Sequence, residues 1–419
     1  MRTGTCPNGL RYAVKRSGNA VAYCALSIGA GTRDETYSAS GRPFPAGTAH
    51  FTEHTMFRGT LHKSASVISS YLDRLGGELN AYTTKEEIVL HATVLKEDLG
   101  KAARLLFELA TQSTFLDSEI ETERGVILDE IISYKDNPAE DIYDSFEGML
   151  FKGSPLETPI LGTLASVKKI TPSLLQRFVA EKFIPSRMAF TVVADIDEKV
   201  LEKRVLKIAS EGISKKLSLR DPVRANSYFD MPSAAINFNK VIDKRNHEVN
   251  AVIGGRAPGL YDMPDRLVAA MLVNLLGGPA SNSLLNAELR EKKGWVYGIE
   301  CSYTQYADTG VFAIAFGCDK PNLQQCLDAI HRILEKLCAK PLSDARLRAC
   351  RKQLLGQLAI SSESGEAQCL SMGKSLLAWG TVMSPEETRQ RLSSITATDL
   401  QSMARRLFAK DNLSSLVYL

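Results

Sequence analysis

The chain has 419 residues, of which 44% are hydrophobic and 24% are charged, a composition typical of a water-soluble globular protein. This length exceeds that of one ordinary hydrophobic core and predicts two domains. The net charge of +3 is close to neutral for this size, which gives no case for nucleic acid or a membrane surface as a partner.

Hydropathy and cysteine usage indicate where the protein works. No apolar run reaches the length that spans a bilayer. Residues 1–14 lack the apolar core and small-residue cleavage site of a signal peptide. The eight cysteines contain no C-x-x-C pair, which predicts buried or half-buried free thiols in a reducing compartment. We therefore expect a cytoplasmic protein, or one whose leader has been removed.

The first half of the chain alternates strand and helix patterns. After two strands and an irregular loop over 31–48, a helix is predicted with Thr48 as its N-cap. The predicted elements are strands over 10–14 and 21–29, the Thr48 helix, a helix over 64–75, strands over 78–83 and 88–95, helices over 97–111 and 117–134, a helix opening at 171–172, a strand over 188–196 and a helix over 200–210.

The second half of the chain shows an order of strand and helix patterns similar to that of the first half. Periodicity is lost over 212–232, which predicts an exposed linker. After it come a strand over 249–254, a helix over 262–276, a Gly-Gly break at 277–278, another helix, paired strands and a helix over 326–338. A period of roughly 200 residues fits two related α+β domains, over 1–211 and 233–419.

Residues 50–54 read H-F-T-E-H, an H-x-x-E-H pattern that is the zincin motif written backwards. On a helix, His50 and His54 stand at i and i+4, so both imidazoles project from one face and can bind one zinc ion. Glu53 lies beside the open coordination position, where it can take a proton from water. The alternative is a pair of helical histidines without a metal, next to a solvated Glu.

A catalytic zinc ion needs a third protein ligand. The other four histidines lie far from one another in the sequence, so the best candidates are carboxylates on the predicted helix over 117–134. Glu123 and Glu130 are seven residues apart and therefore lie on one face of that helix. The alternative for each is a solvated or salt-bridged surface carboxylate, which the residues alone favour.

The segment E-R-G-V-I-L-D-E over 123–130 ends 76 positions after His54 (130 − 54). Together with H-F-T-E-H, it resembles the pitrilysin/insulinase family of inverted zincins. The length resembles the shorter branch, which includes the mitochondrial processing peptidases and their bacterial relatives, although the loop over 36–47 is longer and richer in proline than usual. Similar segments cover nearly the whole chain: G-T-R-D-E (31–35), F-R-G-T (57–60), P-I-L-G-T (159–163), L-G-G (276–278) and R-E-K-K-G-W-V-Y (290–297).

The resemblance implies roles for the motif residues. His50, His54 and Glu130 would be the ligands of one zinc ion per chain, and Glu53 would be the general base. Glu123 matches a second acidic position that supports the site without being the main ligand, as a carboxylate that orients a ligand histidine does.

The resemblance also implies a role for Arg290 and Tyr297, which match the family's R-x₆-Y element. Such a pair hydrogen-bonds substrate and helps to stabilise the tetrahedral intermediate. From the residues alone, Arg290 reads as a cation near a helix C-terminus and Tyr297 as a half-buried strand aromatic. In the shorter branch the element faces the zinc ion from a partner subunit, so a chain that carries both parts is expected to form an active homodimer, possibly with a related partner subunit.

Residues 76–83 have the character of an edge strand, to which an extended peptide could add by main-chain hydrogen bonds. The alternative is an ordinary edge strand, blunted by Glu78 and Lys85. The resemblance favours substrate binding and implies contacts at Asn80, Ala81 and Phe57.

These observations predict a zinc metalloendopeptidase with an α+β fold. Each of its two domains would have a mainly antiparallel sheet flanked by helices, and peptides or unfolded polypeptide segments would be cleaved inside a closed chamber. The alternatives are a non-catalytic scaffold or binding subunit, as in family members that have lost the site, and a structural zinc domain, which would prefer four Cys or His ligands.

Overall fold

The computed structural model describes residues 1–36, 38, 40–212 and 237–419, and these residues form two compact units. The first unit contains described residues of 1–132, 158–212 and 360–383, and the second contains those of 133–157, 237–359 and 384–419. Most of the predicted linker over 212–232, and positions 37 and 39 of the loop before the motif, lie outside the described residues.

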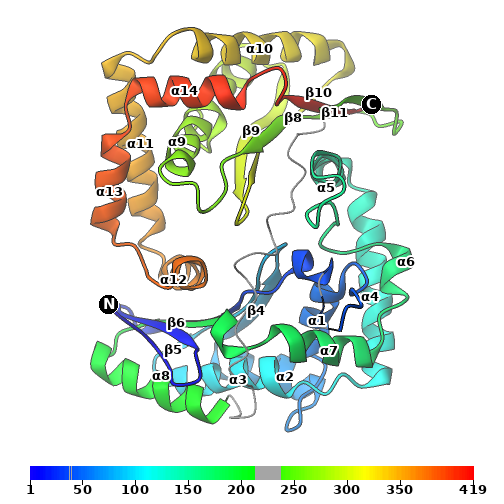
Figure 1. Cartoon of the computed structure of the whole chain (residues 1–419), viewed down its shortest axis with the longest axis vertical. Coiled ribbons are helices and arrows are strands. Elements are labelled where there is room, and N and C mark those ends of the chain that lie inside the picture. Colours follow the sequence, from blue (N-terminus) through cyan, green and yellow to red (C-terminus); the bar gives the residue numbers. More distant parts are fainter. Residues whose placement is uncertain (37, 39, 213–236) are drawn as a thin grey trace. The chain divides into compact units, whose positions relative to one another are not determined.

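The first unit is built on a six-stranded mixed sheet with the strand order β1-β2-β6-β3-β5-β4 (Figure 1). Its elements are β1 Arg2–Thr5, β2 Arg11–Arg16, β3 Val21–Ile28, η1 Thr32–Thr36, α1 Thr48–Met56, α2 Ala65–Tyr71, η2 Asp73–Leu75, β4 Glu78–Thr83, β5 Ile88–Leu95, α3 Leu99–Gln112, α4 Asp117–Lys135, α6 Leu164–Val167, α7 Pro172–Lys182, η3 Pro185–Arg187, β6 Met188–Ala194, α8 Glu198–Gly212 and α12 Gly365–Trp379.

The second unit is built on a five-stranded mixed sheet with the strand order β7-β11-β8-β10-β9. Its elements are α5 Pro138–Leu150, β7 Asn239–Ile242, β8 Val249–Ala257, α9 Asp265–Gly277, the π-helix η4 Asn286–Lys292, β9 Val296–Gln305, β10 Gly310–Cys318, η5 Lys320–Asn322, α10 Leu323–Ala339, α11 Asp344–Ser361, α13 Pro385–Ser394, α14 Ala397–Leu407 and β11 Ser414–Tyr418.

The two sheets share one topology, which confirms the predicted repeat. In the first sheet β2 pairs with β6 in parallel, and the successive pairs β6-β3, β3-β5 and β5-β4 are antiparallel. In the second sheet β7 pairs with β11 in parallel, and β11-β8, β8-β10 and β10-β9 are antiparallel. By this correspondence α9 takes the place of the motif helix α1. The predicted fold class, α+β with two related, mainly antiparallel sheets flanked by helices, is therefore confirmed.

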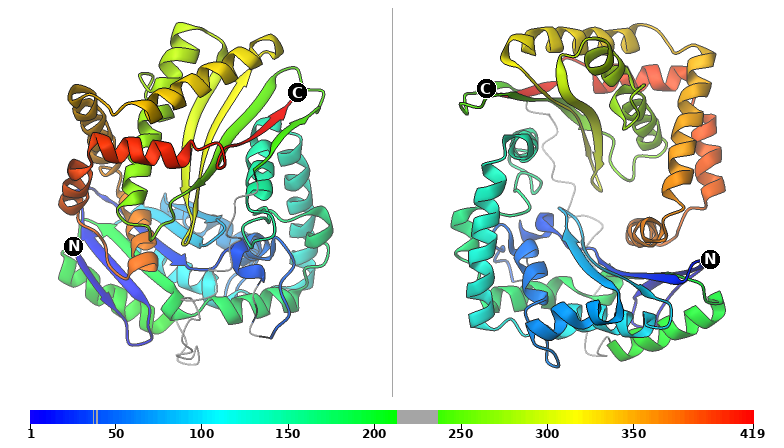
Figure 2. Two further views of the ribbon diagram at one scale, coloured as in Figure 1. Left: turned by 45° about the horizontal axis from the view of Figure 1, so that its top comes forward. Right: turned by 180° about the vertical axis from the view of Figure 1, so that it is seen from behind.

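Each unit includes one helix from the other half of the sequence (Figures 1 and 2). Helix α12 packs on β2, β3 and β6 of the first sheet, and α5 packs on β8 and β11 of the second. The predicted division into 1–211 and 233–419 misses this exchange, because helices α5 and α12 were not predicted at all.

Both exchanged helices bury apolar side chains on a sheet face that α3 or α9 does not cover. In β3 the side chains alternate, so that Cys24 and Leu26 join the core with α3, while Ala25 faces α12. On α12, Met372 and Leu376 complete that second layer. Helix α5 does the same for the second sheet, where its side chains pack with residues of β8, β10 and β11.

Two other sequence-based predictions have clear outcomes. All eight cysteines are free, seven of them buried, which confirms the predicted thiols. No helix in the described ranges combines the length and the apolar character that a membrane crossing requires.

The contact between α12 and the first sheet depends on a glycine. A Cβ atom added at Gly373 would lie 2.4 Å from Ser27 Oγ, whereas one added at Gly356 on α11 would meet nothing within 4 Å. We therefore predict that Gly373→Leu lowers the free energy of unfolding by about 2 kcal/mol or more, because overpacking forces the helix off the sheet. The matched control Gly356→Leu removes a helical glycine in open space and should be neutral or stabilising by up to about 1 kcal/mol. Urea unfolding of both variants measures the difference, and equal stabilities would contradict the packing argument.

Candidate metal centre

Helix α1 carries the H-x-x-E-H motif and begins at Thr48, so the prediction that Thr48 is the N-cap is wrong. Gly47 occupies the N-cap position with a left-handed φ of 86°. The helix start is stabilised instead by buried Glu35, whose carboxylate accepts hydrogen bonds from the backbone N–H of Gly47 at 3.0 Å and of Ala49 at 2.8 Å. A carboxylate suits this position because helix N-terminal N–H groups lack partners within the helix.

His50 and His54 project side by side from α1, with their ring centroids 4.5 Å apart. Glu130 of α4 approaches both: its Oε2 lies 3.8 Å from His50 Nε2 and 3.7 Å from His54 Nε2. One potential ligand atom from each of these three residues lies within 4.8 Å of the others. The structure thus brings together the three residues predicted as ligands, which are 76 positions apart at the widest gap (130 − 54).

These residues fit a zinc ion on the evidence of the protein atoms alone. Ligands bound tetrahedrally at about 2.0–2.2 Å lie roughly 3.3–3.6 Å from one another, close to the observed separations. The Glu130 Oε2 atom is buried and has no hydrogen-bond partner, although 42% of its side chain is exposed. A buried carboxylate oxygen without a partner is costly, and a cation between the three ligand atoms would satisfy it.

Glu123 of α4 lies behind His54 and fixes its orientation. The Nδ1–H of His54 donates to Glu123 Oε1 at 2.9 Å, which leaves Nε2 directed at the side where Glu130 lies. The second oxygen of Glu123 accepts from Nε of Arg58. Burial alone would raise the pKa of Glu123, but the hydrogen bonds from His54 and Arg58 hold it below its ordinary value. The carboxylate therefore stays ionised behind the imidazole, the arrangement that orients ligand histidines in metal sites.

The protein's own groups also set the charge of the two imidazoles. Burial and the neighbouring His54 lower the pKa of His50 to about 3, so His50 is neutral at ordinary pH and has a nitrogen lone pair to offer a cation. Burial opposes protonation of His54, but Glu123, Glu53 and Glu130 outweigh it and raise the pKa. Burial raises the pKa of Glu130 as well. A dication would reverse the last two shifts by replacing the protons that these groups hold.

Glu53 stands on the same helix turn as His54 and is held from β4. The hydroxyl of Thr83 donates to Glu53 Oε2 at 3.0 Å. Burial raises the pKa of Glu53, against the opposing effects of His54 and Thr83. A carboxylate of raised basicity and fixed orientation is suited to accept a proton from a neighbouring molecule.

A pocket of about 650 Å³ opens beside this carboxylate, entirely within the first unit. Phe57, the residue after α1, and Leu79 of β4 give it apolar walls next to Glu53 and His54. Strand β4 ends the sheet order, so the edge beyond it pairs with no strand in the described ranges. The predicted edge-strand character is confirmed, and Asn80 and Ala81 lie on that strand.

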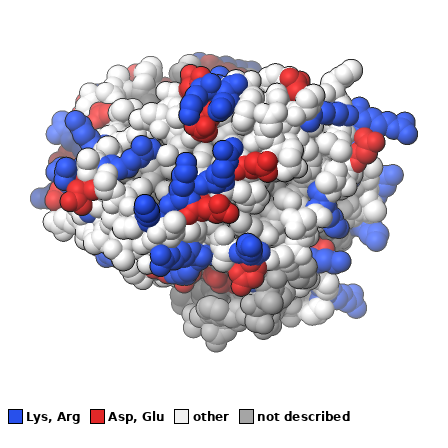
Figure 3. Space-filling model, turned by 90° about the horizontal axis from the view of Figure 1, so that it is seen from above, with Lys and Arg blue, Asp and Glu red and all other residues white. Residues whose placement is uncertain are grey.

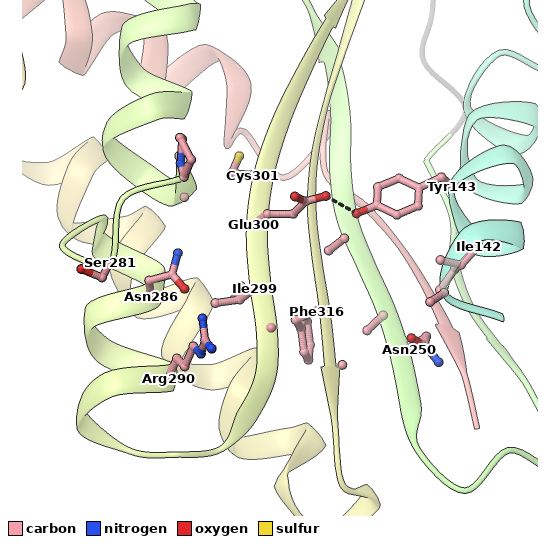
Figure 4. A pocket seen from close by; sticks show the side chains of 18 residues that line it. Ile142, Tyr143, Asn250, Ser281, Asn286, Arg290, Ile299, Glu300, Cys301 and Phe316 are labelled. Carbon is pink, nitrogen blue, oxygen red and sulfur yellow. Dashed lines mark hydrogen bonds between the residues drawn. The ribbon is translucent and has the colours of Figure 1, made fainter. Parts of the chain in front are cut away.

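Arg290 and Tyr297 belong to the second unit, whereas the candidate ligands and Glu53 belong to the first. Exposed Arg290 lies on η4 and lines a cavity of about 530 Å³, across which Tyr143 of α5 donates to Glu300 of β9 at 2.6 Å (Figure 4). Tyr297 is 59% exposed and donates to Asp319 at 2.7 Å. The register shifts at this point, since Val296 and Gly298 pair with adjacent residues of β10, so Tyr297 is the extra residue of a β-bulge. Bulges at sheet edges re-aim side chains, often at functional sites.

Among the described residues of the second unit, no counterpart of the three candidate ligands is found. Helix α9, which occupies the topological place of α1, contains no histidine. Within the described ranges, His50, His54 and Glu130 are the one group of three or more His, Cys, Asp or Glu residues with ligand atoms close enough for a metal ion.

Sequence reasoning missed three residues that hold this site in place: Glu35, Arg58 and Thr83. Arg58 stands at i+4 from His54, a spacing that marks a neighbour on one helix face. The contacts of Glu35 and Thr83 depend on a loop and a strand folding back on α1, which no local pattern encodes.

Comparison with known proteins agrees with this geometry. The model of the insulinase family, peptidase family M16, matches residues 11–164, and the model of the peptidase M16 inactive domain matches residues 169–354. An uncharacterized zinc protease of Streptomyces coelicolor is 29% identical over 98% of this chain and 88% of its own length. Another from Bacillus subtilis is 27% identical over 99% of this chain and 97% of its own.

Solved structures show the same fold. A protease from Helicobacter pylori superposes with a TM-score of 0.89 at 20% identity, covering 100% of this chain and 98% of that one. A peptidase M16 inactive domain from Pseudomonas fluorescens reaches 0.87 at 17% identity, covering 100% and 97%. The two family models together cover most of the sequence in the order of its two halves, and we conclude that the chain belongs to peptidase family M16, the insulinase or pitrilysin family.

Proposed function

We propose that this protein is a zinc-dependent metalloendopeptidase that hydrolyses peptides or unfolded polypeptide segments. The observation that carries the proposal is the convergence of His50, His54 and Glu130, with Glu53 on the same helix turn and an open pocket beside it. The names of the relatives as zinc proteases support the same activity.

His50 Nε2, His54 Nε2 and Glu130 Oε2 would hold the zinc ion, one per chain, and leave a fourth position open. When bound, the ion would supply Lewis acidity at that position, which polarises a peptide carbonyl and makes water more acidic. Glu123 keeps His54 in the tautomer that offers Nε2, and Arg58 keeps Glu123 ionised.

Glu53 performs the proton transfers. It accepts a proton from the water that attacks the peptide carbonyl and then delivers that proton to the leaving amine nitrogen. The Thr83 hydroxyl donates to the carboxylate and fixes its orientation, and burial raises the pKa of Glu53, so that it binds the proton more readily than an exposed Glu would.

The proposed base can be tested without disturbing the ligands. Glu53→Gln keeps the size of the side chain but removes the proton acceptor, so we expect peptide hydrolysis to fall about 10²–10⁴-fold with zinc content unchanged. The matched control is Glu97→Gln, at an exposed Glu outside the site. Kinetics on a quenched peptide, together with metal analysis, give both readouts. Full activity in Glu53→Gln would exclude this carboxylate as the base.

Substrate would lie along β4 in an extended conformation. The outer edge of β4 offers main-chain groups that recognise any sequence, so contacts at Asn80 and Ala81 would be tolerant of the side chain. The pocket beside Phe57 would receive the side chain of a residue next to the scissile bond.

Arg290 and Tyr297 would bind substrate and donate hydrogen bonds to the developing oxyanion, from the same chain or from a partner chain. The bulge that exposes Tyr297 and the cavity beside Arg290 support this role. We expect Tyr297→Phe and Arg290→Lys each to reduce kcat about 10²-fold or more, because a lost donor raises the barrier by several kcal/mol. Zinc content and unfolding midpoint should not change. Unaltered kinetics in both variants would show that neither residue takes part in the reaction, and the hydrogen bond from Tyr297 to Asp319 would then be structural.

Three further features are part of the proposal. Cleavage would take place in a closed chamber, which would exclude folded proteins, and the active form would be a homodimer or a pair with a related subunit. The protein would work in the cytoplasm. Mass measurement in solution tests the homodimer, and a lone active chain would contradict it.

The runner-up is a non-catalytic scaffold or binding subunit. Taken by itself, the second unit fits a non-catalytic subunit, because α9 contains none of the candidate zinc ligands. A zinc-loaded, folded protein that cleaves no peptide would favour this role for the whole chain.

A further inference from the structure

The second unit has a groove of about 640 Å³ that plays no part in the site described above. It lies between η4, α10 and the start of α11. Its lining consists of five basic side chains, one acidic one and a set of apolar and small residues: Lys292, Arg332, Lys336, Lys340 and Arg346; Glu288; Leu284, Ala329, Ile333, Leu337, Ala339, Pro341, Leu342 and Ser343.

Three of the basic residues, two of them on α10, follow one another in a row at four-residue spacing. Repulsion between like charges on α10 destabilises that helix. Arg332 and Lys336 of α10 stand at i and i+4, and Lys340 follows as the C-cap residue in an extended conformation; all three are exposed. Like charges at this spacing lie next to one another and destabilise an isolated helix by a few tenths of a kcal/mol per pair. The helix C-terminus favours cations in the last turn, which accounts for Lys336 and Lys340 but not for Arg332.

No acidic side chain within the described ranges forms an ion pair with this row. Arg332 donates only to a backbone carbonyl, that of Asp328 in its own helix. The single acid of the groove, Glu288, pairs with Lys292 at 3.1 Å and also interacts electrostatically with Lys336. With five basic side chains and one acidic one, the lining of the groove keeps a net positive charge.

The floor between these cations is apolar. On α10, Ala329, Ile333 and Leu337 repeat at the same spacing as the basic row and line the groove from one side. Ile333 is only partly buried, and Leu342, at the start of the next segment, is also partly exposed. A cation-rimmed, apolar-floored groove of this volume matches the size of binding pockets for side chains and small ligands.

Figure 3 shows the protein from the end at which α10 lies in Figure 1, with Lys and Arg side chains spread over this face. Acidic groups are interspersed among them, so this face is not a uniform positive field of the kind that binds nucleic acid. The combination of local positive charge with a concave apolar floor favours a peptide, because one peptide can place an apolar side chain in the groove and acidic side chains beside the cations around it.

We propose that this groove is a docking site for an acidic segment of a partner protein, anchored by a bulky apolar side chain. The anchor would pack on Ile333, Leu337 and Leu342, and flanking Asp or Glu side chains would pair with the row on α10 and with Arg346. The complementary charges would speed association and fix the orientation of the segment, while the buried anchor would supply most of the affinity.

The test is a binding measurement on the full-length chain carrying Glu53→Gln, so that cleavage of the probe cannot confuse the result. The probe is a fluorescein-labelled peptide of alternating Asp and Glu with a central Leu-Leu pair. We expect saturable binding that weakens with salt, because exposed charges are screened beyond about 10 Å at 0.1 M. A peptide with Ser-Ser in place of Leu-Leu should bind at least about tenfold more weakly, because it lacks the apolar anchor.

A matched pair of variants on α11 locates the site. Arg346 lines the groove, whereas Arg348, two residues further along the same helix and also exposed, does not. Arg346→Glu should weaken binding about tenfold or more, and Arg348→Glu, with the same change in net charge, by less than about twofold. Arg332→Glu is a second groove variant, for use if Arg346→Glu alters the circular dichroism spectrum.

Three results would overturn the proposal: no saturable binding, equal loss in Arg346→Glu and Arg348→Glu, or equal affinity for the Leu-Leu and Ser-Ser peptides. Displacement of the peptide by phosphatidylserine vesicles at matched charge would assign the surface to anionic lipid instead. Because binding is measured directly, these outcomes are independent of whether the protein cleaves peptides.

Discussion

An imidazole binds a metal ion through a ring nitrogen that carries no proton, and the orientation of His54 depends on its contact with buried Glu123. The carboxylate accepts the Nδ1 proton and thereby fixes which nitrogen faces Glu130 and His50. It must itself be ionised at a buried position, which requires Arg58 on its other oxygen. Arg58 keeps Glu123 ionised, and Glu123 in turn orients His54. The three-residue site and its open position depend on that orientation.

The same requirement explains which residues α1 supplies to the site and which residues α4 supplies. Helix α1 supplies His50, Glu53 and His54 on adjacent turns, which fixes the distance between the proposed base and the ligands. Helix α4 supplies Glu123 and Glu130, two turns apart, on either side of His54. Because the ligands come from two helices whose buried side chains join one hydrophobic core, their separation depends on the packing of that core in the first unit. The corresponding helix of the second unit, α9, contains no histidine, and that unit instead carries the cavity beside Arg290 and the basic groove.

The sequence predicted most of what depends on local pattern. The motif helix, the strands of both sheets that follow clear alternation, and the repeat were predictable because periodicity and turn residues encode them. The pairing of Glu130 with the two histidines came from family resemblance, since seven-residue spacing alone left Glu123 and Glu130 equivalent. The structure separates their places by contact: Glu123 reaches Nδ1 of His54, and Glu130 reaches both Nε2 atoms.

What could not be predicted depends on contacts between distant segments. Thr is a residue type that often caps helices, but Thr48 does not cap α1. Glu35, twelve residues before Gly47 in the sequence, accepts the hydrogen bonds at the helix start instead. Thr83 ends an ordinary strand pattern, and its role in holding Glu53 follows only from how β4 lies against α1. The exchange of α5 and α12 between the halves was missed because neither helix was predicted, and even a predicted amphipathic helix does not specify which sheet it covers.

The most direct test of the central claim is a zinc titration of the metal-stripped protein, followed by both calorimetry and hydrolysis of a quenched peptide. If His50, His54 and Glu130 form one catalytic zinc site, binding should saturate at one ion per chain, and activity should rise from zero in proportion to the occupied sites. Glu123→Gln should bind zinc about 10–100-fold more weakly, because the support behind His54 is lost. Hydrolysis that persists without metal, or saturation without activity, would contradict the account.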